Sequence, residues 1–252
     1  MIALLRVEAI KLRRTWVWPL VALGPFGVVS LNALHYLLNR AGLVTPGAGA
    51  ANWLRLLTGI NSLLVPTLAV GVAIVAALVA GLEQRGRMWK ALRALPLPAW
   101  QLYAAKFACA LGVLAVASAA CAVGTVALGV LLGLGPAVPW TAVAWEGVRP
   151  YLAAYALVAL QLALSVLLRS QAVAIGAGIL AFILSVAATA LPRWLPWVYP
   201  ALASPVAGIH PAPAPAALAA LAAGWAYVAA GVALGIAGAA VGAWAFGRQD
   251  TP

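Results

Sequence analysis

The sequence predicts an all-α, polytopic integral membrane protein with six transmembrane helices, an N-terminal interfacial helix and a further short helix in a cytoplasmic loop. Three observations predict this class. The 252-residue chain is 66% hydrophobic and 8% charged, whereas soluble domains carry about 25% charged residues. The apolar residues form runs of membrane-spanning length. The positive charges sit in short loops between these runs, so the net charge of +11 reports membrane orientation and not nucleic-acid binding.

Residues 1–14 are predicted to form a short, charged helix that is only modestly amphipathic. Its apolar stripe consists of Ile2, Leu5, Ala9 and Leu12. Two interpretations stay open: an interfacial helix on the inner leaflet, or a basic flank that fixes orientation. Both place the N-terminus inside. The next apolar run, Trp16 to Leu38, is longer than the roughly 7–15 residues of a signal-peptide core, so we expect it to remain as a span.

The whole chain, residues 1–252, is predicted to form a single transmembrane domain. Its six spans are expected near residues 16–38, 56–82, 102–134, 151–168, 172–191 and 216–246. Residues 135–149 are expected to form an outer loop with Trp140, Trp145, Glu146 and Arg149. Residues 192–215 contain seven of the seventeen prolines, which a helix cannot accommodate. We expect an outer interfacial segment there, with a short re-entrant piece as an open alternative.

The distribution of Lys and Arg orients the predicted spans. Eleven of these residues fall on the inner side if the N-terminus is inside: Arg6, Lys11, Arg13, Arg14, Arg85, Arg87, Lys90, Arg93, Lys106, Arg169 and Arg248. Four fall outside, namely Arg40, Arg55, Arg149 and Arg193. Positive charge concentrates on the cytoplasmic side of membrane proteins. Both termini are therefore predicted to be cytoplasmic.

The chemistry-bearing residues suggest a protein that is not an enzyme. The four acids, Glu8, Glu83, Glu146 and Asp250, are expected in loops or flanks, and His35 and His210 near the outer face. No spacing predicts a catalytic group, a metal site or a cofactor site. The glycines, such as Gly124, Gly176 and Gly178, are interpreted as permitting close helix packing.

No charged residue is expected within the core of a span. Ion-coupled transporters usually place an ionisable group there, although sodium can be held by carbonyls and hydroxyls alone. Three polar residues are candidates for a substrate path: Asn32, Asn61 and Gln161. The alternative is that these side chains form hydrogen bonds between helices. Energy for uphill transport is then expected to arrive from outside the membrane.

The longest charged interruption, residues 83–98, is the predicted point of entry for that energy. Met88 or Trp89, Leu92 and Leu95 recur at helical spacing, and Pro96 and Pro98 end the pattern. Arg87, Lys90 and Arg93 lie on the other faces. The pattern favours a short amphipathic helix that docks a soluble partner. The alternative is a basic loop whose Trp89 anchors in lipid headgroups.

This segment resembles a known family. The run Glu83, Gly86, Trp89-Lys90, Leu92, Leu95-Pro96, Tyr103 and Lys106, together with the opening Glu8, Lys11-Leu12-Arg13-Arg14, Trp16 and Gly24-Pro25, is similar to six-span ABC transporter permeases of the type-2 exporter class. The resemblance is to the bacitracin-resistance and lantibiotic-immunity branch. Met88 stands where the family often has a small hydroxyl residue. The order of elements agrees along the chain, while the specific motifs lie in residues 1–38 and 81–106.

The resemblance implies a permease subunit of an ATP-driven exporter in the bacterial cytoplasmic membrane. Two permease copies, or this one and a related one, would bind separate ATPase subunits that hold ATP and Mg, since this chain has no Walker motif. The implied ATPase-coupling residues are Glu83, Arg87, Trp89, Lys90, Leu92, Arg93, Leu95 and Pro96. The cargo would be a hydrophobic or amphipathic substrate, such as a peptide antibiotic, a drug or a lipid, moved outward.

Two other functions remain as alternatives to the exporter. One is a self-sufficient secondary transporter or channel, disfavoured by the expected lack of ionisable groups within the spans. The other is a membrane enzyme or assembly factor, disfavoured by the lack of clustered acids, histidines and metal ligands. Membrane lipid is the expected surrounding partner in every case, and nucleic acid is not expected as a partner.

Overall fold

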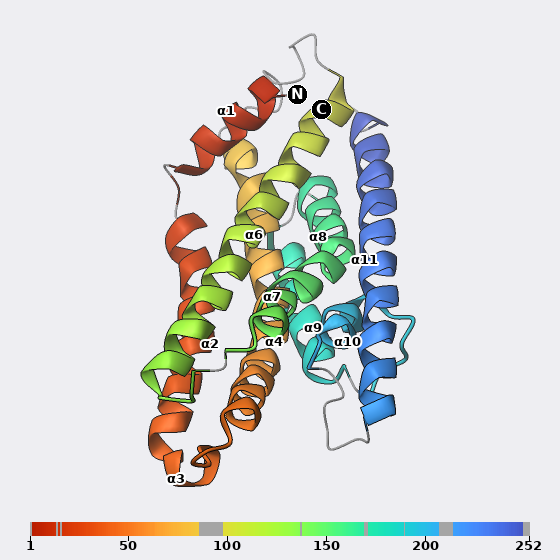
Figure 1. The fold of residues 1–252 in the computed structure, drawn as a ribbon. Helices are drawn as coiled ribbons and strands as arrows, with labels where there is room; N and C mark the ends of the chain where they lie inside the picture. The colour runs from red at the N-terminus through yellow and green to blue at the C-terminus, as the bar shows by residue number, and fades with distance from the viewer. Residues whose placement is uncertain are drawn as a thin grey trace.

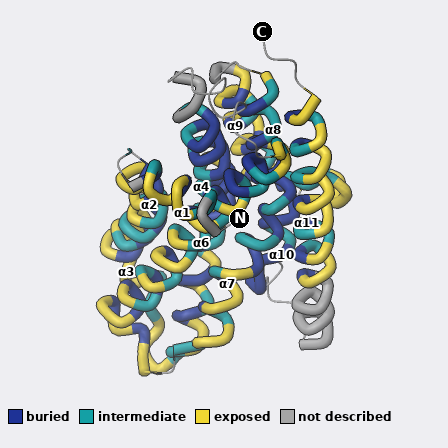
Figure 2. The backbone as a smooth tube through the Cα atoms, turned by 90° about the horizontal axis from the view of Figure 1, so that it is seen from above, coloured by how far each residue is buried: buried dark blue, intermediate teal, exposed yellow. Residues whose placement is uncertain are grey.

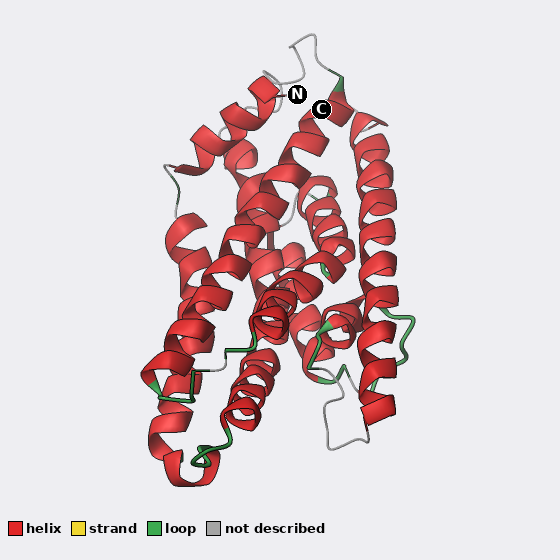
Figure 3. Cartoon of the chain, in the orientation of Figure 1, coloured by secondary structure: helices red, strands yellow, loops and turns green. Residues whose placement is uncertain are grey.

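The computed structural model describes residues 2–13, 15, 17–85, 98–136, 138–168, 171–188, 190–206 and 214–248. Within these ranges the regular structure is helical and contains no strand, as Figure 3 shows. Lipid offers the backbone no hydrogen-bond partners, so helices that satisfy their own backbone groups are the expected solution for a strongly apolar chain. The predicted all-α class is confirmed.

The helices differ widely in length. Their bounds are α1 Ile2–Arg13, α2 Val17–Leu38, α3 Arg40–Leu43, α4 Gly49–Arg85, α6 Ala99–Leu131, α7 Trp140–Ala153, α8 Tyr155–Leu167, α9 Gln171–Val186, η1 Pro196–Val198, α10 Tyr199–Ala203 and α11 Ala214–Arg248.

Four helices in the described ranges are long and apolar enough to cross a membrane: Val17–Leu38, Gly49–Gly81, Ala99–Leu131 and Gly224–Arg248. A fifth span results if α7 and α8, which meet at a 40° bend, count as one broken span. The part of α9 from Val173 to Val186 is apolar but shorter. The polytopic membrane class is confirmed, while the count of six spans and their boundaries stay predictions.

The predicted loop over residues 135–149 is wrong from residue 140 onward, because Trp140–Ala153 forms the helix α7. Its buried side chains repeat at helical spacing: Val143, Glu146, Arg149, Pro150 and Ala153. Two of these side chains are charged, so the sequence shows no apolar stripe that would predict a helix here. Pro150 lies within the helix, and the bend into α8 follows at Ala154.

The long helices stand side by side, and Figure 1 shows how their ends are distributed. The end of the bundle where α1 lies and α11 finishes is here called the terminal end. The opposite end, where α3 turns the chain from α2 into α4, is called the α3 end. Helix α4 ends and helix α6 begins at the terminal end (Figure 1). The two helix ends that flank the predicted docking segment therefore both lie at the terminal end.

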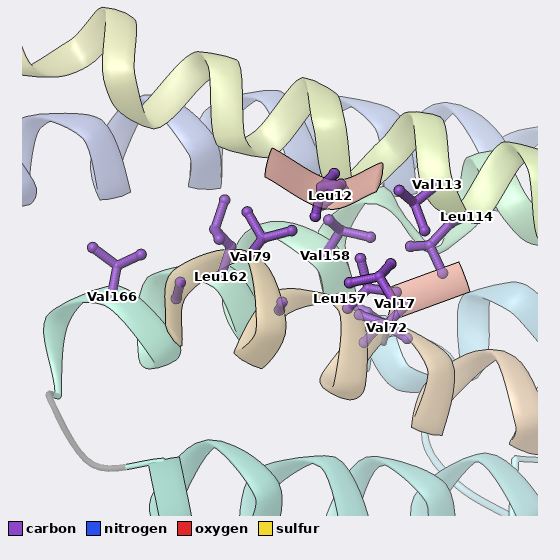
Figure 4. Packing of buried hydrophobic residues seen from close by; sticks show 14 of the residues in the cluster. Leu12, Val17, Val72, Val79, Val113, Leu114, Leu157, Val158, Leu162 and Val166 are labelled. Atoms are coloured by element: carbon purple, nitrogen blue, oxygen red, sulfur yellow. The ribbon is translucent and has the colours of Figure 1, made fainter. Parts of the chain in front are cut away.

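Helix α4 is the central helix, since it packs against α2, α6, α8 and α9. Val79 of α4 belongs to one apolar cluster with Val158 and Leu162 of α8 and with Val113 of α6, and Figure 4 shows these side chains. Leu12 brings α1 into the same cluster. This packing joins the N-terminal helix to the bundle, so α1 is more than a basic flank.

Two of the three glycines proposed to permit close packing do so. A side chain on Gly124 would meet Cγ2 of Val29 at 2.8 Å, and one on Gly178 would meet Cβ of Ala73. A side chain on Gly176 would find no atom within 4 Å. Gly124 and Gly178 thus let α6 approach α2 and let α9 approach α4, whereas Gly176 faces open space.

The outside of the bundle is apolar. Leu23, Phe26 and Leu37 on α2 are 62%, 70% and 68% exposed, and Figure 2 shows exposed residues along the outward sides of α2 and α11. Exposed apolar surface on this scale is a liability in water and a requirement in a bilayer. The burial pattern therefore agrees with the membrane class.

Candidate functional site

Glu8 of α1 and Lys106 of α6 form a buried ion pair. Nζ of Lys106 lies 3.4 Å from Oε2 of Glu8, and Nζ of Lys11 lies 2.8 Å from Oε1 of Glu8. Lys106 also donates a hydrogen bond of 3.4 Å to the backbone carbonyl of Val79 in α4. Glu8 and Lys106 are only 5% and 2% exposed. We call Glu8, Lys11, Lys106 and the Val79 carbonyl the terminal ion cluster, and it joins α1, α4 and α6.

The terminal ion cluster shows burial that the sequence did not indicate. Lys106, counted among the inner-side charges, is buried among the helices within the candidate span Ala99–Leu131. Glu8, expected in a flank, is buried as well. On α1, the inward face carries Glu8 and Leu12, whereas Ala9 of the predicted apolar stripe is exposed. The cluster forms because α1 packs against α6 and brings together two residues 98 positions apart. The periodicity of residues along one helix does not predict a contact with another helix.

The predicted docking residues fall mostly outside the described part of the chain. Glu83 lies in the last turn of α4, and its side chain is not described. Seven others lie in the undescribed range 86–97: Arg87, Trp89, Lys90, Leu92, Arg93, Leu95 and Pro96. Their role stays a prediction. The described residues fix only the two helix ends that carry this segment, and the terminal ion cluster contacts both helices.

Two of the three proposed path residues connect helices. Nδ2 of Asn32 donates to the carbonyl of Val28 at 2.9 Å and to that of Gly59 on α4 at 3.4 Å. Nε2 of Gln161 donates to the carbonyl of Ala174 on α9 at 3.3 Å. Oδ1 of Asn61 is buried and has no hydrogen-bond partner within the described ranges. These contacts favour the interhelical interpretation for Asn32 and Gln161, and the substrate path stays a prediction.

A second charged group lies on α7, contrary to the expectation that Glu146 and Arg149 belong to a loop. Glu146 and Arg149 are 3% and 6% exposed. Oγ of Ser204, just after α10, donates to Oε2 of Glu146 at 2.6 Å. The Arg149 guanidinium lies over the ring of Trp225 in α11, 4.3 Å from the ring centre, and 5.6 Å from that of Trp145. We call these five residues the aromatic box.

Sequence reasoning missed the aromatic box as a site. Trp145, Glu146 and Arg149 were placed together in a loop, but Ser204 and Trp225 come from other elements. The available signal was the three-residue spacing of Glu146 and Arg149, which puts an acid and a base on one face of a helix. A further link ties α7 to the bundle, because Oγ of Ser118 in α6 donates to the carbonyl of Gly147.

Two apolar hollows open on the bundle. A groove of about 680 Å³ lies between the start of α6 and the end of α11, where Trp100, Phe107, Ala240 and Trp244 line it. A much smaller hollow of about 60 Å³ lies among α2, α4 and α6 beside Gly24. Both are walled by apolar side chains, which suits lipid or the apolar part of a substrate.

Similarity to known proteins identifies the family to which the chain belongs. No curated protein matches the chain. The family model described as ABC-2 family transporter protein matches residues 4–188, a range that extends from α1 through α9. It therefore includes the terminal ion cluster, the predicted docking segment and α7. Because this match covers well over half of the chain, the chain belongs to the ABC-2 family transporter proteins, as a membrane-spanning permease subunit of an ABC exporter.

Proposed function

We propose that this permease moves a hydrophobic or amphipathic substrate outward across a bacterial cytoplasmic membrane, driven by a separate cytoplasmic ATPase that docks on residues 83–98. One observation carries this proposal: Lys106 contacts Glu8 of α1 and the Val79 carbonyl of α4 from its place on α6. Helices α4 and α6 are the two that enter and leave the docking segment. A force applied to that segment therefore acts on α4 and α6, which Lys106 already connects to each other and to α1.

The mechanism follows from this connection. ATP-driven closure of the partner would displace the segment between Arg85 and Ala99. Ion pairs and packed side chains transmit such displacements because they have discrete arrangements and do not deform continuously. The terminal ion cluster would make α1, α4 and α6 move as one unit. Helix α4 would pass the motion to α8 and α9, against which it packs.

The remaining partners follow from the same proposal. ATP and Mg would be bound by the ATPase, and this chain would carry no cofactor. The permease would pair with a second copy or a related permease, in surrounding lipid. Both termini would be cytoplasmic, which agrees with the finish of α11 at the same end of the bundle as α1 (Figure 1) and with the concentration of positive charge. We place the chain in the bacitracin-resistance and lantibiotic-immunity branch because of the motif around Trp89.

The secondary transporter remains the competing function, and one observation favours it more than the sequence did. Lys106, Glu146 and Arg149 are buried ionisable groups in helices of the bundle, and such groups are often part of ion pathways. The two functions differ in their energy source. Transport by the purified complex in vesicles that depends on ATP and survives collapse of ion gradients supports the exporter, and the reverse result supports the competitor.

The decisive experiment is capture of the ATPase. The permease is co-expressed with a candidate P-loop ATPase from the same genome and purified by a tag on the permease. Trp89→Asp and Leu92→Asp are expected to abolish co-purification and stimulated ATP hydrolysis, because a charge would enter the apolar face of the docking helix. Trp194→Asp serves as the matched control, since Trp194 is 73% exposed and lies between α9 and α10. An intact complex with both Asp variants in the docking segment contradicts the proposal.

A further inference from the structure

The aromatic box has the composition of a cation-binding site. The rings of Trp145 and Trp225 meet edge to face, with centres 4.9 Å apart and planes at 79°. The guanidinium of Arg149 lies against both rings, at 4.3 Å from Trp225 and 5.6 Å from Trp145. Aromatic faces attract cations at such distances, and pairs of aromatic side chains are a recurring means of recognising ammonium groups. Here the chain's own cation occupies the site.

The acid of the box has an unused acceptor. Oε2 of Glu146 accepts the hydrogen bond from Ser204, but Oε1 is buried and accepts no hydrogen bond from any residue in the described ranges. An unsatisfied buried carboxylate oxygen is unfavourable, and a donor or a positive charge that reaches it gains an unusually strong contact. The acid also interacts electrostatically with Arg149. Oε1 of Glu146 thus offers an acceptor to a donor or a cation that reaches it.

The box opens toward the surroundings of the bundle. Trp145 and Trp225 are 40% and 39% exposed, whereas Glu146 and Arg149 lie almost fully buried beneath them. Trp225 lies in helix α11, which begins earlier, at Ala214, and runs to the terminal end. The box therefore lies within the length of that helix, with both indole rings facing the surroundings of the bundle. An amphiphile in those surroundings would meet the rings with its headgroup.

We propose that the aromatic box is a recognition site for cationic amphiphiles, and that Arg149 holds the place of the ligand's charged group until the ligand displaces it. The inference rests on the proposed function and deepens it, because it names the substrate class: molecules that combine an apolar body with a positive headgroup. The headgroup would take the place of the guanidinium between Trp145 and Trp225, within reach of Oε1 of Glu146. The apolar body would lie along the exposed surface of α7 and α11.

The competing explanation is a purely structural role, in which Arg149 fastens α7 to α11. The two explanations predict opposite effects of removing the guanidinium. If Arg149 is only a fastener, Arg149→Met loosens the site and weakens any binding there. If Arg149 competes with the ligand, the same change empties the box and strengthens binding. Arg149→Lys retains a competing cation and is expected to behave like the original chain.

The test measures binding of tritiated tetraphenylphosphonium to the purified full-length permease in phosphatidylcholine nanodiscs, by a proximity assay that counts only protein-bound label. Dodecyltrimethylammonium is expected to compete and dodecyl sulfate, with the same chain and opposite charge, is not. Trp225→Leu is expected to weaken binding about fivefold, and Glu146→Gln at least as much. Arg149→Met is expected to strengthen it about fivefold. Trp140→Leu is the matched control, because Trp140 lies on the same helix, 65% exposed and outside the box.

Equal competition by the two detergents, or weaker binding by Arg149→Met in a chain that melts normally, overturns the proposal. If Arg149→Met does not fold, the pair Trp225→Leu and Trp140→Leu decides, since equal binding by both variants removes the box from recognition. Failure here is separable from failure of the exporter function. Loss of cation selectivity while the ATPase still co-purifies contradicts only the substrate class, whereas cation binding without any ATPase complex contradicts only the exporter.

Discussion

The terminal ion cluster and the aromatic box each contain a buried acid and a buried base, but the two acids have different partners. Both oxygens of Glu8 lie within 3.4 Å of a lysine Nζ. Glu146 has one oxygen bonded to a neutral hydroxyl and the other without a hydrogen-bond partner in the described ranges. The first acid is fully used within the fold, which suits a rigid connection. The second retains capacity for a ligand, which suits recognition.

The largest expected effect comes from removing the cation of the first pair. Lys106→Met leaves Glu8 buried beside Lys11 alone and disconnects α1 from the Val79 carbonyl. Breaking a buried pair in this way costs about 3–5 kcal/mol. The free energy of unfolding of the purified chain, measured by denaturant titration in micelles, should fall by that amount, and stimulation of the ATPase by the permease should fall with it.

The double variant Glu8→Leu with Lys106→Met is the control for that prediction. Replacing both charged partners by apolar side chains removes the uncompensated charge, so most of the lost stability should return. ATPase stimulation is expected to remain low, since the connection is still missing. A double variant that is as unstable as Lys106→Met would mean that packing around α1, and not charge pairing, holds this region together.

A smaller effect is expected at the aromatic box. Ser204→Ala removes the donor to Oε2 of Glu146, so that the buried acid loses a hydrogen bond, at a cost of about 2 kcal/mol. The loss is smaller than at Lys106 because the serine carries no charge. Ser62→Ala is the matched control, because the Ser62 hydroxyl bonds to the Gly59 carbonyl at an exposed position. Equal stability of the two variants would contradict the buried role assigned to Ser204.

The contrast between the two regions also explains what the sequence predicted and what it could not. Long apolar runs identified the membrane class and the approximate places of α2, α4, α6 and α11, because hydrophobicity over about twenty residues is a local property. Helix α7 was not predicted, because Glu146 and Arg149 interrupt the apolar pattern of its buried face. A charged residue in a sequence indicates exposure, an inference that fails wherever tertiary contacts supply a partner.

The contacts that define both sites are long-range. Glu8 meets Lys106 across 98 positions, and Glu146 meets Ser204 across 58. The sequence therefore showed the charged residue of each contact but not the residue with which it pairs. Within α1, the pair Glu8 and Lys11 was readable from its three-residue spacing. That local pair is the weaker part of its cluster, which leads to the last prediction.

The smallest effect is expected for Lys11→Met. Lys11 lies 2.8 Å from Glu8, closer than Lys106, but it belongs to the same helix and its side chain is 23% exposed. A partly exposed pair three residues apart contributes about 0.5 kcal/mol and is weakened by salt. The variant should lower the free energy of unfolding by that amount at low salt and by less at high salt, with ATPase stimulation retained. If Lys11→Met were as damaging as Lys106→Met, the acid would be held chiefly within α1, and the connection from α1 to α4 and α6 would not depend on the buried lysine.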